Sequence, residues 1–495
     1  MEPDPSPSSG GIGSPPSIAE THSAWVILLG DRAYKLKKPV KLDFLDFSTR
    51  EARGAIAQRE VELNRRLAPD VYLGVSDVLG PDGTVCDHLV VMRRMPDDRR
   101  LSTLVRANAT LDDEIRQIAR VIAAFHARAG TSPAIASTGK PDAIRDKVER
   151  DLEEMRGFAG SMLDVDTLDE IGVLIRGYLD GRRPLLDDRM AQGCVIDGHG
   201  DLLADDIFCL PDGPRILDCI EFDDRLRYGD VLADVAFLVM DLERIGAAEL
   251  GAQFVAAYQE FSAEHHPVTL LDYFVASRAL IRSKVACIRT MQGHDASRQD
   301  ASLLLELARD HLRRGAVRLV LIGGAPGTGK STLAAAIAER LGWVVARSDE
   351  VRKELVGLGH DVHAEAAIDE GIYDRATTDA TYQVLLDHAR HALEFGESVI
   401  LDASWSRQQW RTMAAQISRE TSSTLVELCC DAPIEVTDQR IEQRRVWGDD
   451  SSDATPSVAA SMRARFESWP DAQVIATGSS LDASLAAALR VLNDR

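Results

Sequence analysis

Residues 319–332 combine side chains and a spacing that suit the binding of a polyphosphate. The apolar residues Leu319 to Ile322 predict a strand, and an amphipathic helix is predicted from Lys330 onward. The glycine-rich turn between them lets backbone N–H groups point at phosphate oxygens, with the positive end of the helix dipole behind them. Lys330 can reach the β- and γ-phosphates, and the Ser331 hydroxyl can bind Mg²⁺. The predicted P-loop, a site for Mg²⁺ and ATP, is formed by Gly324, Ala325, Pro326, Gly327, Thr328, Gly329, Lys330, Ser331 and Thr332.

Three further features of the C-terminal half favour phosphoryl transfer over other uses of a nucleotide. Asp349 follows the second predicted strand, at the edge of the sheet where ligands collect, and its carboxylate can deprotonate an acceptor hydroxyl. Asp402 ends an apolar strand, at the place of a carboxylate that holds Mg²⁺ directly or through water. Arg440 and Arg444 have helical spacing, so they can close over ATP and neutralise the transferring phosphoryl group.

Each of these features also has a structural interpretation. Asp349 could be the N-cap of the next helix, because Ser-Asp before an apolar-periodic segment is a common helix start. Asp402 could simply end its strand, and the arginines could form a solvated helix face.

The C-terminal half resembles the predicted-kinase group of P-loop proteins, which is related to gluconate, shikimate and polynucleotide-end kinases. The resemblance rests on the P-loop, on Asp402-Ala-Ser404 after a predicted strand, and on the acidic stretch 449–454 near the lid arginines. Alternating predicted strands and helices in this half indicate a parallel sheet covered by helices.

A second group of residues able to do chemistry lies at His199-Gly200-Asp201, with Asp206 five residues later and a predicted hairpin over 206–222. These residues resemble the aminoglycoside-phosphotransferase branch of the protein-kinase-like fold. The resemblance implies that Asp201 accepts the proton of a substrate hydroxyl. It also implies that Lys35 holds the α- and β-phosphates of ATP and that Glu60 is its helix partner.

This sequence departs from that family's pattern at the metal ligands. The family has an asparagine where Asp206 stands, so a carboxylate replaces a neutral amide and adds negative charge beside the phosphates. Asp218 and Glu221 are both candidates for the metal-binding acid after the hairpin. The opening strands also lack a glycine-rich loop over the phosphates. A kinase-like module without catalytic activity, or an ordinary turn at His199, therefore remains an alternative.

Other polar residues near this group have expected structural roles. We expect Asp230 and Asp234 to cap a helix and brace the loop around Asp201. Arg278 and Arg282 share one face of a predicted helix that also carries Lys284. They could meet an anionic substrate, although an ion-paired or solvated face is the favoured interpretation.

The sequence predicts two domains and a short tail. Residues 1–18, rich in Pro, Ser and Gly, are expected to be a disordered tail. Residues 19–314 are expected to form a bilobal α+β protein-kinase-like domain, with strands at 24–30, 33–38 and 88–95 and helices from about 111 to 190 and from 231. Residues 315–495 are expected to form the α/β P-loop NTPase domain.

Composition limits the possible partners. The 495 residues carry a formal net charge of −22, and both halves are acidic, which disfavours a broad nucleic-acid surface. Seven cysteines show no metal-binding spacing, and no apolar run approaches a membrane span, so a cytoplasmic location is expected.

The favoured function is transfer of the γ-phosphoryl group of ATP to a hydroxyl of a small polar metabolite. A regulatory ATP-binding protein and a nucleotide or nucleic-acid-end kinase are the alternatives.

Overall fold

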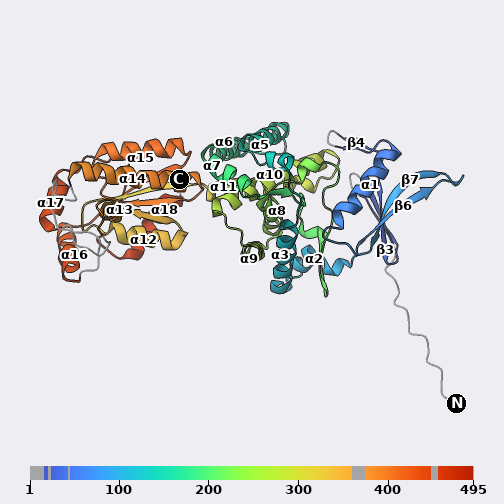
Figure 1. The fold of residues 1–495 in the computed structure, drawn as a ribbon, viewed down its shortest axis with the longest axis horizontal. Helices are drawn as coiled ribbons and strands as arrows, with labels where there is room; N and C mark the ends of the chain where they lie inside the picture. The colour runs from blue at the N-terminus through green and yellow to red at the C-terminus, as the bar shows by residue number, and fades with distance from the viewer. Residues whose placement is uncertain (1–15, 21–23, 43–44, 359–373, 448–454, 494–495) are drawn as a thin grey trace, which may run out of the picture. The chain divides into compact units, whose positions relative to one another are not determined.

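The computed structural model describes residues 16–20, 24–42, 45–358, 374–447 and 455–493, and it divides into two compact units (Figure 1). The first unit comprises Met1–Asp151, Arg189–His265 and Phe274–Ala308. The second unit comprises Leu152–Asp188, His266–Tyr273 and Arg309–Arg495. The domain boundary near residue 315 stays a prediction.

The first unit contains an antiparallel sheet with the strand order β1-β2-β3-β7-β6. Its strands are β1 (Ser17–Glu20), β2 (Ala24–Leu29), β3 (Arg32–Lys37), β6 (Tyr72–Leu79) and β7 (Val85–Arg93), and a short hairpin is formed by β4 (Lys41–Leu42) and β5 (Leu45–Asp46). Helix α1 (Arg50–Asn64) begins after Thr49, whose hydroxyl accepts a hydrogen bond from the Ala52 N–H. Ala57 and Val61 of α1 pack against Val90 of β7, so the helix is fixed on the sheet.

Two parts of this sheet differ from the expectation. Of the predicted tail, residues 1–15 lie outside the described residues, whereas Ser17–Glu20 form strand β1. Strand β6 was not predicted, and its pairing with β7 is irregular between Tyr72 and Gly74. Such an irregularity breaks the alternation of apolar and polar residues by which a strand is recognised.

Helices make up most of the chain between this sheet and residue 314. They are α2 (Leu101–Arg106), α3 (Asp112–His126), α4 (Pro133–Ser137), α5 (Pro141–Arg156), α6 (Val165–Gly181), α7 (Arg183–Ala191), α8 (Val231–Arg244), α9 (Ala248–Ser262), α10 (Val268–Met291) and α11 (Ser297–Arg314). Every residue of α8 from Val231 to Leu242 is buried, which makes α8 the central helix of the first unit.

Two small two-stranded sheets lie between α7 and α8. Strand β8 (Val195–Asp197) pairs with β11 (Tyr228–Asp230), and β9 (Ile207–Leu210) pairs with β10 (Gly213–Ile216), both antiparallel. Three 3₁₀ turns are also present, at η1 (Asp97–Arg99), η2 (Ala204–Asp206) and η3 (Asp224–Leu226). The loop that contains Asp201 lies between β8 and β9, so one strand of each small sheet flanks it.

The second unit contains a five-stranded parallel sheet with the order β13-β14-β12-β15-β16. Its strands are β12 (Arg318–Gly323), β13 (Val344–Arg347), β14 (Val399–Asp402), β15 (Thr424–Asp431) and β16 (Gln473–Ala476). All six residues of the central strand β12 are buried. The predicted parallel sheet is confirmed, and the edge strand β16 was missed.

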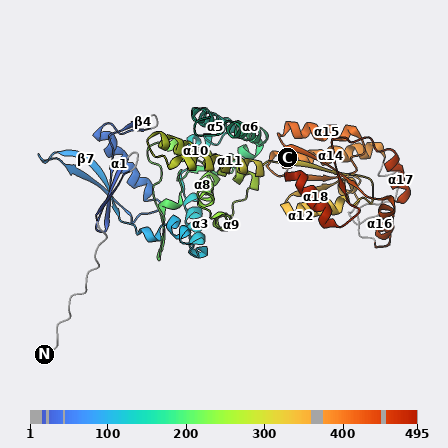
Figure 2. The same ribbon diagram turned by 180° about the vertical axis from the view of Figure 1, so that it is seen from behind.

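Helices cover both faces of this sheet (Figures 1 and 2). They are α12 (Lys330–Leu341), α13 (Ser348–Leu355), α14 (Arg375–Glu394), α15 (Gln408–Glu420), α16 (Ile434–Trp447), α17 (Pro456–Ala464) and α18 (Leu481–Asn493). Leu333 and Ile337 of α12 and Leu492 of α18 pack on Val320 and Ile400 of the sheet. This core fixes the start of α12 at the carboxyl end of β12.

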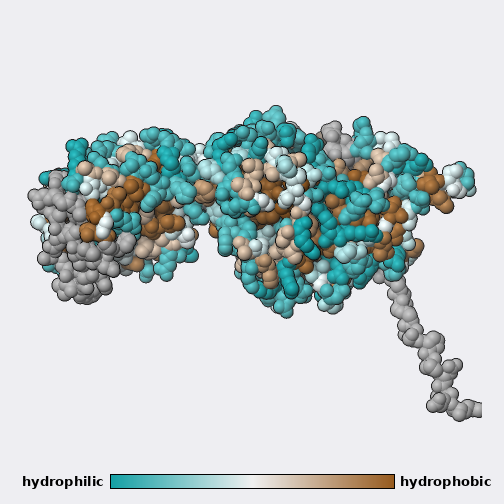
Figure 3. Space-filling model, viewed as in Figure 1, coloured by the Kyte–Doolittle hydropathy of each residue, from teal (hydrophilic) through white to brown (hydrophobic). Residues whose placement is uncertain are grey.

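The surface is mixed in character. Hydrophilic residues cover much of the face shown in Figure 3, including the region of α5. Among the described helices, none is both long and apolar enough to span a bilayer.

Candidate active sites

The turn between β12 and α12 has the backbone conformation that the predicted P-loop requires. Gly324, Gly327 and Gly329 have φ values of 135°, 82° and 86°, which residues with a side chain rarely adopt. A Cβ atom on Gly327 would lie 2.6 Å from the backbone oxygen of Thr437, so α16 approaches this turn closely. Glycine is therefore required both for the conformation and for the close approach.

Side chains of the P-loop are held by its own backbone. The Lys330 ammonium donates to the Ala325 backbone oxygen at 3.1 Å, so it lies across the turn on the side where the amides converge. The Thr328 hydroxyl donates to the same oxygen at 2.8 Å. Ser331 is half-buried and Thr332 exposed in the first turn of α12, next to the N–H groups that lack helical partners.

Asp402 lies at the edge of the sheet beside the P-loop strand. It is the last residue of β14, is buried, and stands in register with Ile322 of β12. Arg347 of β13 lies 3.5 Å from its carboxylate. The register thus brings a buried carboxylate next to the strand that enters the P-loop, where it fits a role as Mg²⁺ ligand.

Asp349 lies in the first turn of α13 and is partly buried. The N-cap of α13 is Arg347, with no side-chain cap, so Asp349 does not occupy the N-cap position. Its neighbour Arg352 is buried and donates to the Thr378 hydroxyl at 3.0 Å. Tyr382 of α14, which sequence reasoning missed, accepts from the Trp405 N–H at 3.1 Å and so ties α14 to the loop after Asp402.

Arg440 lies against the P-loop. It donates to the backbone oxygen of Thr477 at 2.8 Å and lies 3.5 Å from that of Gly327. Arg444 lies on the same helix, α16, but its side chain falls outside the described part of the structure.

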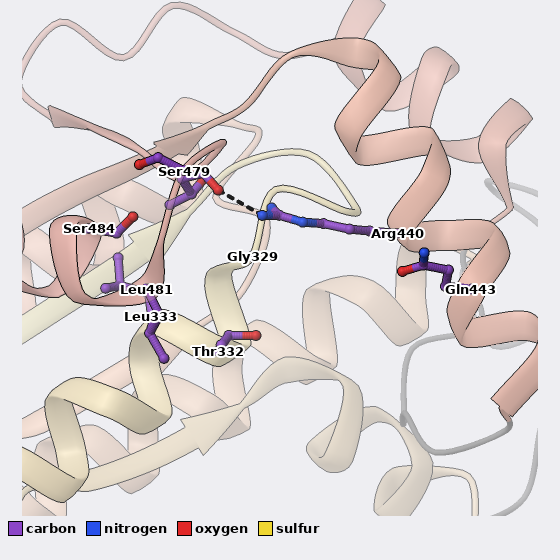
Figure 4. Close-up of a pocket in the computed structure, with 9 residues that line it drawn as sticks. Gly329, Thr332, Leu333, Arg440, Gln443, Ser479, Leu481 and Ser484 are labelled. Atoms are coloured by element: carbon purple, nitrogen blue, oxygen red, sulfur yellow. Dashed lines mark hydrogen bonds between the residues drawn. The ribbon is translucent and has the colours of Figure 1, made fainter.

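A pocket of about 310 Å³ opens next to this arginine (Figure 4). In Figure 4 the Arg440 side chain extends across the pocket toward the segment that holds Ser479. The pocket is lined by Gly329, Thr332, Leu333, Arg440, Gln443, Thr477, Ser479, Leu481 and Ser484. Sequence reasoning missed this pocket, because its walls come from α12, α16, the turn before α18 and α18 itself.

In the first unit, two lysines of β3 and three carboxylates form a charge network, in which Lys37, Glu60 and Glu221 are buried and Asp218 is exposed. Lys35 contacts Glu60 at 2.9 Å and Asp218 at 2.5 Å. Lys37 contacts Glu60 at 2.7 Å and also pairs with Glu221. Burial alone would lower the pKa of Lys35, but the carboxylates of Asp218 and Glu60 raise it well above its ordinary value. The predicted pair of Lys35 and Glu60 is brought together.

Lys37 was not predicted, although the sequence contains a signal for it. Residues two apart in a strand share one face, so Lys37 lies on the same side of β3 as Lys35. Only 1% of Lys37 is exposed, and a buried ammonium needs carboxylate partners. Glu60 and Glu221 fill that need.

Besides its contact with Lys35, Asp218 lies near enough to Asp206 for their charges to interact. Burial, followed by the nearby charges of Asp218 and Asp201, raises the pKa of Asp206 well above its ordinary value. Within the described residues, no three acidic, His or Cys side chains are arranged to hold a metal by themselves. Mg²⁺ is commonly held by one or two carboxylates together with phosphate oxygens and water, and Asp206 and Asp218 fit that donor set.

The loop around Asp201 is braced as predicted. The carboxylate of Asp234 accepts hydrogen bonds from the His199 N–H at 2.6 Å and the Gly200 N–H at 2.9 Å. His126 lies 3.4 Å from the same carboxylate. Asp230 caps α8 by accepting from the Leu232 N–H, which confirms its expected structural role.

Asp201 itself is partly buried and faces a cation. Both of its carboxylate oxygens lie 3.4 Å from the Arg282 guanidinium of α10. Burial raises the pKa of Asp201, and Arg282 and His199 partly offset this effect. A carboxylate with a raised pKa is better suited to accept a proton from a hydroxyl near neutral pH.

Comparison with known proteins supports the two predicted domains. Residues 40–271 match a family model described as "Phosphotransferase enzyme family", and residues 319–469 match one described as "AAA domain". A protein named "Uncharacterized protein Rv2004c" from Mycobacterium tuberculosis is 41% identical over 474 residues, which is 96% of this chain and 95% of that protein. This chain belongs to the same two-domain family. A Mycobacterium bovis member, "Uncharacterized protein Mb2027c", is equally similar.

Solved structures resemble this two-domain protein only in part. A choline/ethanolamine kinase family protein from Mesorhizobium loti is 13% identical, covers 61% of this chain and 89% of its own, and gives a TM-score of 0.38. A sugar kinase from Janibacter sp. is 20% identical, covers 36% of this chain and 95% of its own, and gives a TM-score of 0.28. The two-domain family thus joins a protein-kinase-like domain to a P-loop kinase-like domain.

Proposed function

We propose that this protein is an ATP- and Mg²⁺-dependent phosphotransferase that acts on a hydroxyl of a small polar metabolite. The observation that carries the proposal is the P-loop with Asp402 beside it. Lys330 lies across a turn with three left-handed glycines, at the start of α12, while Asp402 is in register with the strand that enters the turn. That combination suits a nucleoside triphosphate with its metal.

In the second unit, each residue has a distinct role in transfer. Lys330 neutralises the β- and γ-phosphates, and Ser331 and Asp402 would hold Mg²⁺. A metal held by these two side chains would neutralise negative charge that develops during transfer. Asp349 orients the acceptor hydroxyl and takes its proton as the oxygen forms a bond to the γ-phosphorus, while the bond to the β-phosphate oxygen breaks and ADP leaves with that electron pair. Arg440 stabilises the charge of the transferring group.

The nucleoside of ATP is proposed to lie in the 310 Å³ pocket beside Gly329. The pocket borders the P-loop, and Leu333 and Leu481 provide apolar contact for a base, while the hydroxyls of Ser479 and Ser484 can hydrogen-bond with it. Arg440 can stack on the base or reach the phosphates.

In the first unit, Lys35 and Asp218 are proposed to serve a second Mg·ATP site, with Asp206 as the other carboxylate of the metal. Asp201 takes the proton of an acceptor hydroxyl there. Glu221 is assigned to Lys37 and not to the metal, because the two side chains are buried as a pair.

A second candidate is a regulatory ATP-binding protein in which the first unit is not catalytic. The observation that favours it is the substitution of a carboxylate for an amide at Asp206, in a group already holding Asp201 and Asp218. Titration of Mg·ATP into the Lys330→Ala variant discriminates between the two candidates. Residual binding that is lost on a further Lys35→Ala change supports a working first site, and no residual binding supports the regulatory candidate.

The test of the proposed function uses the full chain and two matched variants. Lys330→Ala should lower the affinity of the second unit for Mg·ATP by at least about tenfold, because a charge-assisted contact to phosphate is lost. Arg340→Ala, an exposed change on the same helix, should leave binding unchanged. Calorimetric titration measures both. Equal affinity in all three proteins would contradict the role of the P-loop.

A further inference from the structure

The backbone at Asp218 has a conformation that residues with a side chain rarely adopt. Its φ of 64° lies in the left-handed region, which is unfavourable because the Cβ atom crowds the backbone. The Asp218 side chain is 47% exposed, and its carboxylate contacts Lys35 at 2.5 Å. A strained residue persists only where its surroundings fix it. The carboxylate proposed to bind the metal of the first unit therefore depends on contacts made by its backbone.

Two buried side chains provide these contacts. The Tyr72 hydroxyl accepts a hydrogen bond from the Asp218 N–H at 3.2 Å. The side-chain oxygen of Asn64 accepts one from the Cys219 N–H at 2.9 Å. Tyr72 and Asn64 are each 1% exposed. The peptide groups on both sides of the Asp218 Cα atom are thus held by side chains of other elements, β6 and α1.

The residue before Asp218 is held by the catalytic loop. The Leu217 N–H donates to the Asp206 backbone oxygen at 2.9 Å, and the His199 ring lies 3.1 Å from the Leu217 backbone oxygen. Since Leu217 is fixed in this way, the contacts of the Asp218 and Cys219 N–H groups decide where the Asp218 side chain points.

Tyr72 lies at the irregular part of strand β6. The pairing of β6 with β7 shifts between Tyr72 and Gly74, and such a shift redirects side chains from their regular alternation. Arg65, at the end of α1, donates to the backbone oxygens of Tyr72 at 2.8 Å and Leu73 at 2.6 Å. Tyr72 is therefore tied to the helix that carries Asn64.

Helix α1 also holds the lysine proposed to bind phosphates. Glu60 contacts Lys35 at 2.9 Å and lies one helical turn before Asn64, whose amide donates to the Glu60 backbone oxygen at 3.0 Å. Packing of Tyr72 in the apolar core of the first unit explains its ring but not its hydroxyl. The hydroxyl has its use in the contact with Asp218.

We propose that Tyr72 and Asn64 are positioning residues, which hold the backbone at Asp218 so that its carboxylate can bind Mg²⁺ together with Asp206. Without these two contacts the φ of Asp218 relaxes to a negative value, and its carboxylate leaves its place beside Asp206 and Lys35. This proposal rests on the proposed function of the first unit.

The test uses the full chain carrying Lys330→Ala, which silences the P-loop. Calorimetry measures the affinity for a nonhydrolysable ATP analogue with Mg²⁺ and with EDTA, and the ratio of the two affinities isolates the contribution of the metal. Tyr72→Phe should lower this ratio by about three- to tenfold, because the competent conformation is less populated, and leave the affinity in EDTA unchanged. Tyr178→Phe is the control, because its buried hydroxyl lies 3.4 Å from Thr269 in the second unit. It should leave the ratio unchanged.

Asn64→Leu, which keeps the side-chain volume but removes the acceptor, should lower the ratio in the same way as Tyr72→Phe. An unchanged ratio in either folded variant overturns the role of that residue. A loss of affinity that is equal with Mg²⁺ and with EDTA also overturns the proposal, because it indicates a general structural role. If Asn64→Leu does not fold, as judged by circular dichroism, Tyr72→Phe alone decides.

The parent chain with Lys330→Ala separates this proposal from the one on which it rests. If that chain does not bind the analogue, or if Mg²⁺ does not strengthen the binding, the proposed function of the first unit is contradicted, and the positioning role is rejected with it. If Mg²⁺ strengthens binding equally in the parent and in Tyr72→Phe, only the positioning role is overturned.

Discussion

At the scale of single residues, one carboxylate fixes the loop that carries Asp201. Asp234 accepts two backbone N–H groups, from His199 and Gly200, inside the first unit. Burial would raise the pKa of Asp234, but the His126 ring and the His199 N–H lower it below its ordinary value. The ionised form of Asp234 therefore stabilises the fold, and this contribution is present above the unfolded-state pKa of about 4 and is lost as the pH falls below it.

Asp234→Asn tests this linkage. The amide must turn an N–H donor toward one of the two backbone donors, so we expect a loss of about 2 kcal/mol of stability at pH 7. The difference from the wild type should shrink as the pH falls below about 4, because the unfolded wild-type chain then takes up a proton at Asp234 while the folded protein keeps this carboxylate ionised. Urea unfolding of both proteins at pH 7, 5 and 3 measures the difference in their free energies of unfolding. A difference that is the same at all three values would contradict the account.

Gly327→Ala tests the packing of the P-loop. The added Cβ meets the Thr437 backbone oxygen and strains a φ of 82°, so we expect about 1–2 kcal/mol of destabilisation and at least tenfold weaker Mg·ATP binding. Gly342→Ala is the control, because its φ is 70° but no atom lies within 4 Å of the new Cβ. It should show a similar backbone cost without the loss of binding. Unchanged binding in Gly327→Ala argues against the P-loop geometry.

Sequence reasoning worked at the residue scale where one short segment contains the whole signal. The P-loop, Lys35 and the loop at Asp201 were found in this way. Tyr382 and the pocket beside Arg440 were not, because they depend on contacts between segments far apart in the chain. Which of Asp218 and Glu221 binds the metal stays a prediction, to which the structure adds that Glu221 pairs with the buried Lys37.

At the scale of elements, the second unit has a buried arginine that joins three helices. Arg182 follows α6 and is 1% exposed. It donates to the backbone oxygen of Leu393 in the last turn of α14 at 2.9 Å, and to those of Thr421 and Ser422 after α15. Carbonyls at helix ends lack helical partners and carry partial negative charge, so a guanidinium is a suitable partner for both helices.

Arg182→Met should destabilise the second unit by about 2–3 kcal/mol, because buried carbonyls lose their donor. Arg183→Met, an exposed change at the neighbouring position, is the control and should have an effect within about 0.5 kcal/mol. Thermal unfolding followed by circular dichroism compares them. Equal stability of the two variants would mean that Arg182 does not hold α14 and α15 in place.

Elements with strong periodicity were predicted well. The buried strands β12, β14 and β15 and the helix after the P-loop match the expectation from their apolar patterns. The edge strand β16 has only one buried residue, Ile475, so its pattern carries little information. The irregular pairing of β6 with β7 likewise weakens the alternating pattern by which β6 could have been predicted.

At the scale of the whole molecule, two kinase-family domains occur in one chain. In each unit the proposed site combines a lysine with a carboxylate, Lys35 with Asp218 in the first and Lys330 with Asp402 in the second. Sequence reasoning identified both domains because their motifs are local.

The most direct test of the central claim is phosphoryl transfer by the intact chain. Purified protein, γ-labelled ATP and Mg²⁺ are incubated with a pool of hydroxylated metabolites, and labelled products are detected by mass spectrometry as a gain of one phosphoryl group. We predict transfer by the wild type and its loss in the double variant Lys330→Ala, Asp201→Asn. Transfer that persists in a correctly folded double variant, or products that carry AMP in place of phosphate, would contradict the account.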